Sequence, residues 1–122
     1  MKLNTLVAAA FASVLLMGCQ STTTEVAKPS ASKEIIEEAK VALQHHEAIT
    51  VDDSGLISIV QTLPDRHYWK TSVVKKIGRE VSCDDLRYFV DAGMVVSIHF
   101  QGSRGRYDQY DANRCLAEDQ YL

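Results

Sequence analysis

The sequence predicts an α+β domain in which helices pack on a small antiparallel or mixed β-sheet and one disulfide closes the fold. Stretches whose apolar residues recur at helical spacing alternate with β-branched runs, and short turns join the β-rich runs. With 122 residues, of which 46% are apolar and 24% charged, the chain has the size and composition of one folded domain rather than a disordered tail. We therefore expect a single core.

The first predicted element of this domain is a helix over residues 33–47. Ser30 or Ser32 can cap its first turn, and the acids at positions 34, 37 and 38 suit the positive end of a helix dipole. The side chains at helical spacing that would form its buried face are Ile35, Ala39, Ala42, Leu43 and His46.

A β-hairpin is predicted to follow this helix. Residues 49–51 and 56–60 are rich in β-branched side chains, which favour strands. The four residues between them have the composition of a turn, in which Gly55 can adopt a positive φ.

A second helix is predicted from Pro64 or Asp65 to Arg79. Its apolar stripe would consist of Tyr68, Trp69, Val73 and Ile77. Asp84 and Asp85 would begin a further short helical segment, which continues through residues 86–90 and ends at Gly93, where a glycine can form a left-handed cap.

The last predicted element is a second hairpin. Residues 94–100 strongly favour a strand, residues 101–105 have turn composition, and residues 106–111 can return antiparallel to the first strand.

The first eighteen residues are typical of an export signal. Lys2 precedes a nearly continuous apolar run that ends at Met17, which is too short for a membrane-spanning helix of roughly 20 residues. The boundary Leu-Met-Gly-Cys at residues 16–19 resembles the lipobox of bacterial lipoproteins, which implies cleavage before Cys19 and a lipid on its sulfur. Gln20 at the next position resembles the signal for sorting to the outer membrane. The alternatives are a plain secretory signal and a permanent transmembrane anchor.

This prediction divides the chain into a signal peptide (1–18), a lipidated flexible tether (19–32) and a globular domain (33–122). The tether assignment rests on a stretch rich in Ser, Thr, Ala and Lys, without apolar periodicity. Loss of Lys2 with the signal leaves 12 basic and 16 acidic side chains, a formal charge of −4. Because no basic excess remains, nucleic acid is not an expected partner.

Two cysteines remain once Cys19 is assigned to the lipid. Cys83 and Cys115 form an even pair in a chain that is sent to an oxidising compartment, so we expect a disulfide between them. The bridge would join the start of the segment after Cys83 to the end of the final strand. A redox-active pair is the alternative, but the two residues lack the close spacing that lowers a thiol pKa.

No combination of residues in the sequence predicts catalysis, a metal site or a cofactor. His45 and His46 are adjacent, so on a helix they point about 100° apart and cannot chelate one ion together. His67 and His99 lie in different elements without the spacing of a known catalytic motif. Trp69 is expected either in the core or as an anchor for a partner, with the core favoured.

The second half of the chain resembles the AspS-type pilotins of type II secretion systems. The resemblance rests on Cys83-Asp84-Asp85, Gly93 before the strand ending Ser97-Ile98-His99-Phe100, the Arg104-Gly105 turn, Tyr107 four residues before Asp111, and Arg114-Cys115. The lipobox and the Ser/Thr-rich tether also match.

This resemblance implies a non-enzymatic lipoprotein on the periplasmic face of the outer membrane, held there by lipid. Such a pilotin binds the C-terminal segment of a secretin, carries it with the lipoprotein-sorting machinery to the outer membrane and promotes ring assembly. Cys19 would carry the lipid, and Trp69 and Val73 are the candidate partner-binding residues because of their apolar stripe. The alternatives are another envelope-binding scaffold lipoprotein without secretin affinity, and a periplasmic enzyme or inhibitor.

Overall fold

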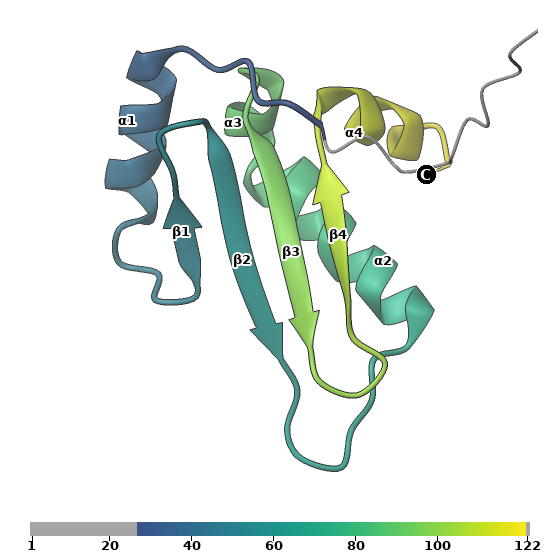
Figure 1. Ribbon diagram of the computed structural model, residues 1–122. Helices are drawn as coiled ribbons and strands as arrows, with labels where there is room; N and C mark the ends of the chain where they lie inside the picture. Colours follow the sequence, from purple (N-terminus) through teal and green to yellow (C-terminus); the bar gives the residue numbers. More distant parts are fainter. Residues whose placement is uncertain (1–26, 122) are drawn as a thin grey trace, which may run out of the picture.

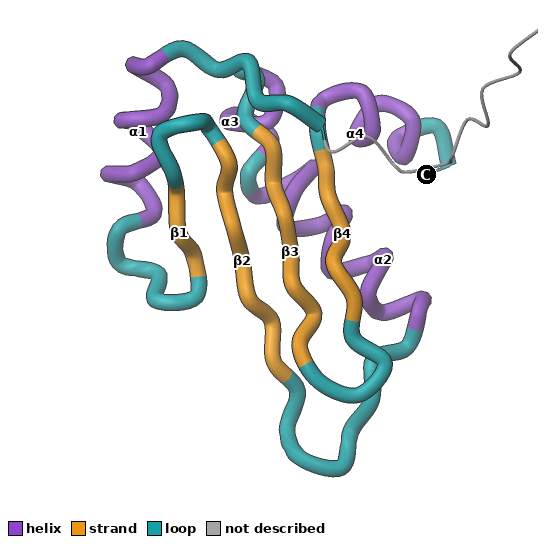
Figure 2. The backbone as a smooth tube through the Cα atoms, in the orientation of Figure 1, coloured by secondary structure: helices purple, strands orange, loops and turns teal. Residues whose placement is uncertain are grey.

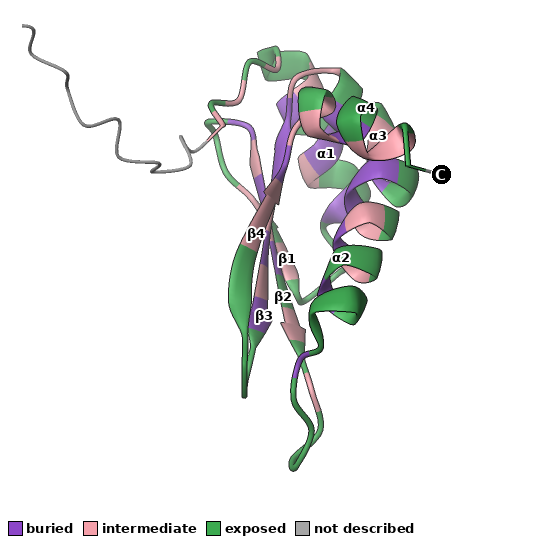
Figure 3. Ribbon diagram, turned by 90° about the vertical axis from the view of Figure 1, so that its right-hand side faces the viewer, coloured by how far each residue is buried: buried purple, intermediate pink, exposed green. Residues whose placement is uncertain are grey.

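A mixed four-stranded sheet organises the fold, and the described helices all lie on one of its faces (Figure 1, Figure 3). The strands follow one another in chain order: β1 (Ile49–Val51), β2 (Leu56–Thr62), β3 (Val95–Gln101) and β4 (Arg106–Tyr110). The outer pairs are antiparallel, whereas β2 and β3 are parallel. The computed structural model describes residues 27–121, so the predicted signal and Cys19 lie outside the described residues. The predicted α+β class is confirmed.

Helix α1 (Lys33–Leu43) begins where the sequence predicts and ends four residues early. The Ser32 hydroxyl accepts the Ile35 N–H at 3.3 Å and caps the first turn. Ile36, Ala39 and Leu43 form the buried face, whereas Ala42 and His46 are exposed. The helix ends because the His46 N–H bonds to the Leu43 carbonyl and the chain then turns into β1.

The predicted β1–β2 hairpin is present, with Ile49 opposite Ile59 and Val51 opposite Ile57. Its turn is held by Asp52, whose Oδ1 accepts the backbone N–H groups of Ser54 and Leu56. Gly55 has φ 98°, a conformation that other residues rarely adopt.

Helix α2 (Thr71–Arg79) starts about six residues later than predicted. Residues 63–70 form a loop instead, because the backbone N–H of Trp69 bonds to the Ser103 carbonyl and its indole N–H bonds to the Gln101 carbonyl. These bonds fix Trp69 beside the β3–β4 turn, outside the helix.

A π-helix, η1 (Glu80–Asp85), continues α2 without a break, so Asp84 and Asp85 end a helical segment rather than beginning one. Helix α3 (Arg87–Asp91) follows, and Gly93, with φ 103°, forms the predicted left-handed cap. This connection returns the chain to the start of β3, as a parallel β2–β3 pair requires.

The β3–β4 hairpin is confirmed, but a helix that the sequence analysis missed follows it. Strand β4 ends at Tyr110, and Asp111, predicted as the last strand residue, caps α4 (Ala112–Asp119). The Asp111 Oδ1 accepts the Arg114 N–H at 2.8 Å. Weak apolar periodicity explains the omission, since Cys115 is the only buried residue of α4.

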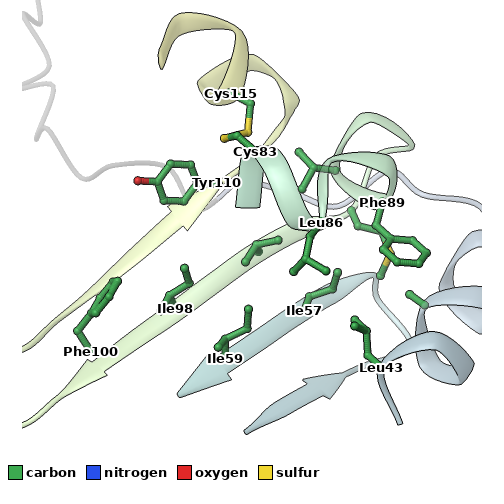
Figure 4. Packing of buried hydrophobic residues seen from close by; sticks show 14 of the residues in the cluster. Leu43, Ile57, Ile59, Cys83, Leu86, Phe89, Ile98, Phe100, Tyr110 and Cys115 are labelled. Carbon is green, nitrogen blue, oxygen red and sulfur yellow. A yellow bond between two sulfur atoms is a disulfide. The ribbon is translucent and has the colours of Figure 1, made fainter. Parts of the chain in front are cut away.

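The core lies between the sheet and the helices (Figure 4). Alternate strand residues face it, among them Ile57, Ile59, Ile98, Phe100 and Tyr110. The residues between them face the other side of the sheet, where no described helix packs; these include Ser58, Val60, Ser97, His99 and Tyr107.

Residues 27–32 belong to the fold, although the sequence predicted the end of a flexible tether there. The Ser30 N–H bonds to the Gly93 carbonyl at 2.8 Å. A Cβ placed on Gly93 would lie 2.7 Å from the Ser30 hydroxyl, so the two segments are in close contact. Across residues 27–121 no helix is both long and apolar enough to cross a bilayer.

Candidate functional site

The four histidines are dispersed over the molecule. His45 and His46 lie in the loop after α1, and His67 lies in the loop before α2. His99 stacks on Tyr107 across β3 and β4, with ring centroids 4.1 Å apart. Within residues 27–121 no group of three or more His, Cys, Asp or Glu side chains is arranged to hold a metal ion. Two of the histidines, His45 and His46, are adjacent in one loop, and the other two lie in separate parts of the fold.

The disulfide between Cys83 and Cys115 is confirmed, with the two Cα atoms 5.4 Å apart. It joins η1 to α4, whereas the sequence predicted a link to the final strand, because helix α4 was not recognised. Both cysteines are fully buried. The bridge therefore acts as an internal cross-link on the helical side of the sheet.

Ion pairs surround this cross-link. The Asp119 carboxylate in α4 accepts a hydrogen bond from Arg87 at 3.0 Å and lies 3.7 Å from Arg79. This one carboxylate therefore links α4 to both α2 and α3. Arg114 lies 3.9 Å from the centre of the Tyr110 ring, and burial raises the pKa of Tyr110 to about 12. The phenol is therefore neutral across the physiological pH range.

A groove opens on the helical side of the sheet, at the end of α1. It is bounded by the loop of residues 44–48, by β1 and β2, and by the last part of η1, and its volume is about 640 Å³. Helix α1 packs against β1, whereas α2 packs against β4, so the second half of β2 lies between them. The early end of α1 at Leu43 therefore leaves this part of the sheet open.

The groove has an apolar floor and a polar rim. The apolar residues that line its floor and walls are Leu43, Ile49, Ile59, Val81 and Leu86. Figure 4 shows Leu43 of α1, Ile59 of β2 and Leu86, which directly follows η1, in the layer between the sheet and the helices. The exposed rim carries His45, His46, Glu47 and Asp85, so the loop after α1 and η1 each contribute one carboxylate. This arrangement suits a ligand with one apolar face and flanking positive charge.

The candidate binding residues Trp69 and Val73 do not line this groove. Trp69 is only 3% exposed and packs edge-to-face on Phe100, with ring centroids 4.9 Å apart. Val73 is 39% exposed on the outer side of α2. The predicted stripe does not form, because Trp69 lies before the first residue of α2. Since its side chain is buried, Trp69 presents no surface to a partner.

The groove was not predicted from the sequence, because its walls come from segments that are far apart in the chain. Leu43 lies in α1, Ile59 in β2 and Leu86 between η1 and α3. The sequence predicted Leu43 on the buried face of a helix, Ile59 in a strand and Leu86 in a short helical segment, but no pattern brought the three together. The exposed sequence His45-His46-Glu47 directly after an apolar helical face was the one available signal.

The groove has the size of a ligand-binding site. Besides the apolar residues named above, its lining carries His45, His46, Glu47, Ala48, Gln61 and Asp85. Its volume falls in the range of about 300–1,000 Å³ that is usual for ligand sites. No family model, curated protein or solved structure matches the chain.

Proposed function

We propose that this protein is a lipid-anchored pilotin that binds the C-terminal segment of a type II secretin, directs it to the outer membrane and promotes its assembly. The observation that supports this proposal best is the groove between α1 and η1, which has an apolar floor and a rim with two carboxylates. The resemblance of residues 83–115 to AspS-type pilotins and the lipobox before Cys19 agree with it. The proposed role is non-enzymatic.

The chemistry of the groove favours an amphipathic helix as the bound form of the partner segment. Such a helix inserts apolar side chains at positions i, i+3 or i+4, and i+7 into a groove of this kind. Ile59 forms part of the floor, and the partly buried Ile49 and Val81 flank it. Exposed carboxylates at Glu47 and Asp85 would attract lysine or arginine beside the apolar face of the segment.

The first experiment is calorimetric titration of the chain from residue 19, with Cys19→Ser to prevent lipidation, against the C-terminal peptide of the host secretin. Residues 27–32 must be included because Ser30 pairs with Gly93. We expect dissociation constants in the low micromolar range, about −8 kcal/mol of binding free energy. Absence of binding under oxidising conditions would favour an envelope scaffold without secretin affinity.

Charge reversal at the rim tests whether the groove is the binding site. Glu47→Lys with Asp85→Lys should weaken peptide binding about tenfold or more, because both carboxylates are exposed and neither takes part in an ion pair within residues 27–121. Glu34→Lys with Asp65→Lys is the matched control, since these exposed acids lie outside the groove. Equal losses in both double variants would place binding elsewhere.

The lipid anchor is tested separately by feeding cells labelled palmitate and fractionating their membranes. The wild-type chain should carry the label and sediment with the outer membrane, whereas Cys19→Ala should remain unlabelled and uncleaved. Label in the inner membrane alone would support lipidation but contradict the sorting step.

A further inference from the structure

Charge is distributed unevenly along the long axis of the domain. Six cationic side chains lie in the loop before α2, in the middle of α2 and around the β3–β4 turn: Arg66, Lys70, Lys75, Lys76, Arg104 and Arg106. We call this surface the basic end. Asp65 is the only carboxylate within residues 62–76 and 101–107. The basic end is therefore strongly positive in a chain whose formal net charge is −3.

The cations of the basic end are exposed and unpaired. All eight ion pairs of residues 27–121 involve Lys40, Arg79, Arg87 or Arg114, which lie elsewhere. All six basic-end cations are solvent-exposed. Because none of these six cations takes part in a described ion pair, their charges remain available to an external anionic partner.

The two loops of the basic end are fixed to each other. The Trp69 N–H bonds to the Ser103 carbonyl at 3.0 Å, and Arg106 donates to the Thr71 hydroxyl at 3.1 Å. Arg104 stacks over the exposed ring of Tyr68, 4.5 Å from its centre. Figure 2 shows these loops side by side at the end of the sheet opposite the entry of residue 27. The basic end is thus a preformed protrusion.

We propose that the basic end binds the anionic headgroups of a phospholipid bilayer. Clustered lysine and arginine bind such surfaces with about 1 kcal/mol per side chain, and an exposed tyrosine suits the depth of the headgroups. A protruding pair of loops fits an extended surface better than it fits a peptide, which binds in a groove. If the chain is also held through Cys19, contact at both ends lays the long axis of the domain along the membrane.

Vesicle binding tests this proposal independently of secretin binding. The chain from residue 19 with Cys19→Ser is sedimented with vesicles of phosphatidylcholine alone or mixed with phosphatidylglycerol. We expect binding only to the anionic vesicles, and its loss at high salt as the charges are screened. Absence of binding to anionic vesicles, or equal binding to neutral ones, would overturn the proposal. So would binding to polyglutamate without binding to vesicles, which would indicate an acidic protein partner.

Matched variants locate the contact. Arg66→Gln with Arg104→Gln should lower the partition coefficient about 25-fold, or about fivefold per cation. Lys75→Gln with Lys76→Gln, exchanges that a helix tolerates, should lower it by a similar factor. Lys28→Gln with Lys33→Gln removes two exposed, unpaired cations at the other end and should change it less than twofold. Equal effects of all three pairs would overturn the assignment to the basic end.

Discussion

The helix over β1 and β2 and the helices over β3 and β4 are held in place by different kinds of contact. We call these two parts of the helical layer the α1 side and the cross-linked side. Over β3 and β4, a disulfide and several ion pairs join the segments α2, η1 and α4. Over β1 and β2, α1 is held by buried apolar side chains, while its ion pairs, from Lys40 to Glu37 and Asp53, lie at the surface. Exposed ion pairs contribute little to stability, so the α1 side depends on apolar packing.

This difference bears on the groove, which lies where the two sides meet. Its η1 wall is covalently tied through Cys83, whereas its α1 wall carries no covalent cross-link in the described chain. Apolar packing is non-directional and allows small shifts that a cross-linked segment resists. We therefore expect the α1 wall to adjust to a bound helix while the η1 wall stays in place.

Removal of the disulfide should give the largest change in stability. Cys83→Ala with Cys115→Ala opens a loop of 32 residues and should lower the free energy of unfolding by about 3–4 kcal/mol. Urea denaturation followed by circular dichroism measures this change. A loss below about 1 kcal/mol would mean that the ion pairs of Asp119 hold α4 by themselves and that the two sides differ less than proposed.

Loss of the helix caps should affect the two sides differently. Ser32→Ala and Asp111→Ala each remove a side-chain bond to a first-turn N–H and should cost about 1 kcal/mol. In α1 we expect faster hydrogen exchange confined to that helix, because it can open locally. In α4 the disulfide limits such opening, so Asp111→Ala should instead lower the free energy of global unfolding. An equal increase in local hydrogen exchange in both helices would contradict the proposed difference between the two sides.

The sequence predicted the elements whose signals are local. Alternation of β-favouring residues on both sides of residues 101–105 predicted the second hairpin. The cysteine count, together with the predicted export signal, predicted the disulfide. Helix α4 was missed because only Cys115 is buried, so its cap at Asp111 had no apolar face to support it. The parallel β2–β3 pair depends on the packing of the whole connection between the strands.

The positions of Trp69 and of the groove could not be predicted for a related reason. Helical spacing placed Trp69 on the stripe of a helix, but its two hydrogen bonds to the β3–β4 turn hold it in a loop. The groove exists because α1 ends at Leu43 and α2 packs over β4. Both features depend on tertiary contacts and not on the local sequence. Periodicity indicates which residues are buried, but it does not show which elements leave a space between them.

The smallest expected effect is a pH dependence that arises in the β1–β2 turn. The hydroxyl of Ser54 and the backbone N–H groups of the turn bond to Asp52 and hold the pKa of its carboxyl below the ordinary value of about 3.9. The folded chain therefore binds fewer protons than the unfolded chain in this range. The contribution of Asp52 to stability is complete above about pH 4 and is lost as the pH falls through the lowered pKa.

Asp52→Asn should consequently destabilise the protein at neutral pH, and the difference from wild type should shrink below about pH 4. Urea midpoints measured between about pH 2 and pH 7 record this change. The control is Asp65→Asn, which removes an exposed and unpaired carboxylate in a loop. Because the turn belongs to the α1 side, hydrogen exchange in β1 should increase at acid pH before exchange in β4 does. If hydrogen exchange in β4 increased first as the pH falls, the weaker contacts would lie on the cross-linked side. The proposed difference between the two sides would then be reversed.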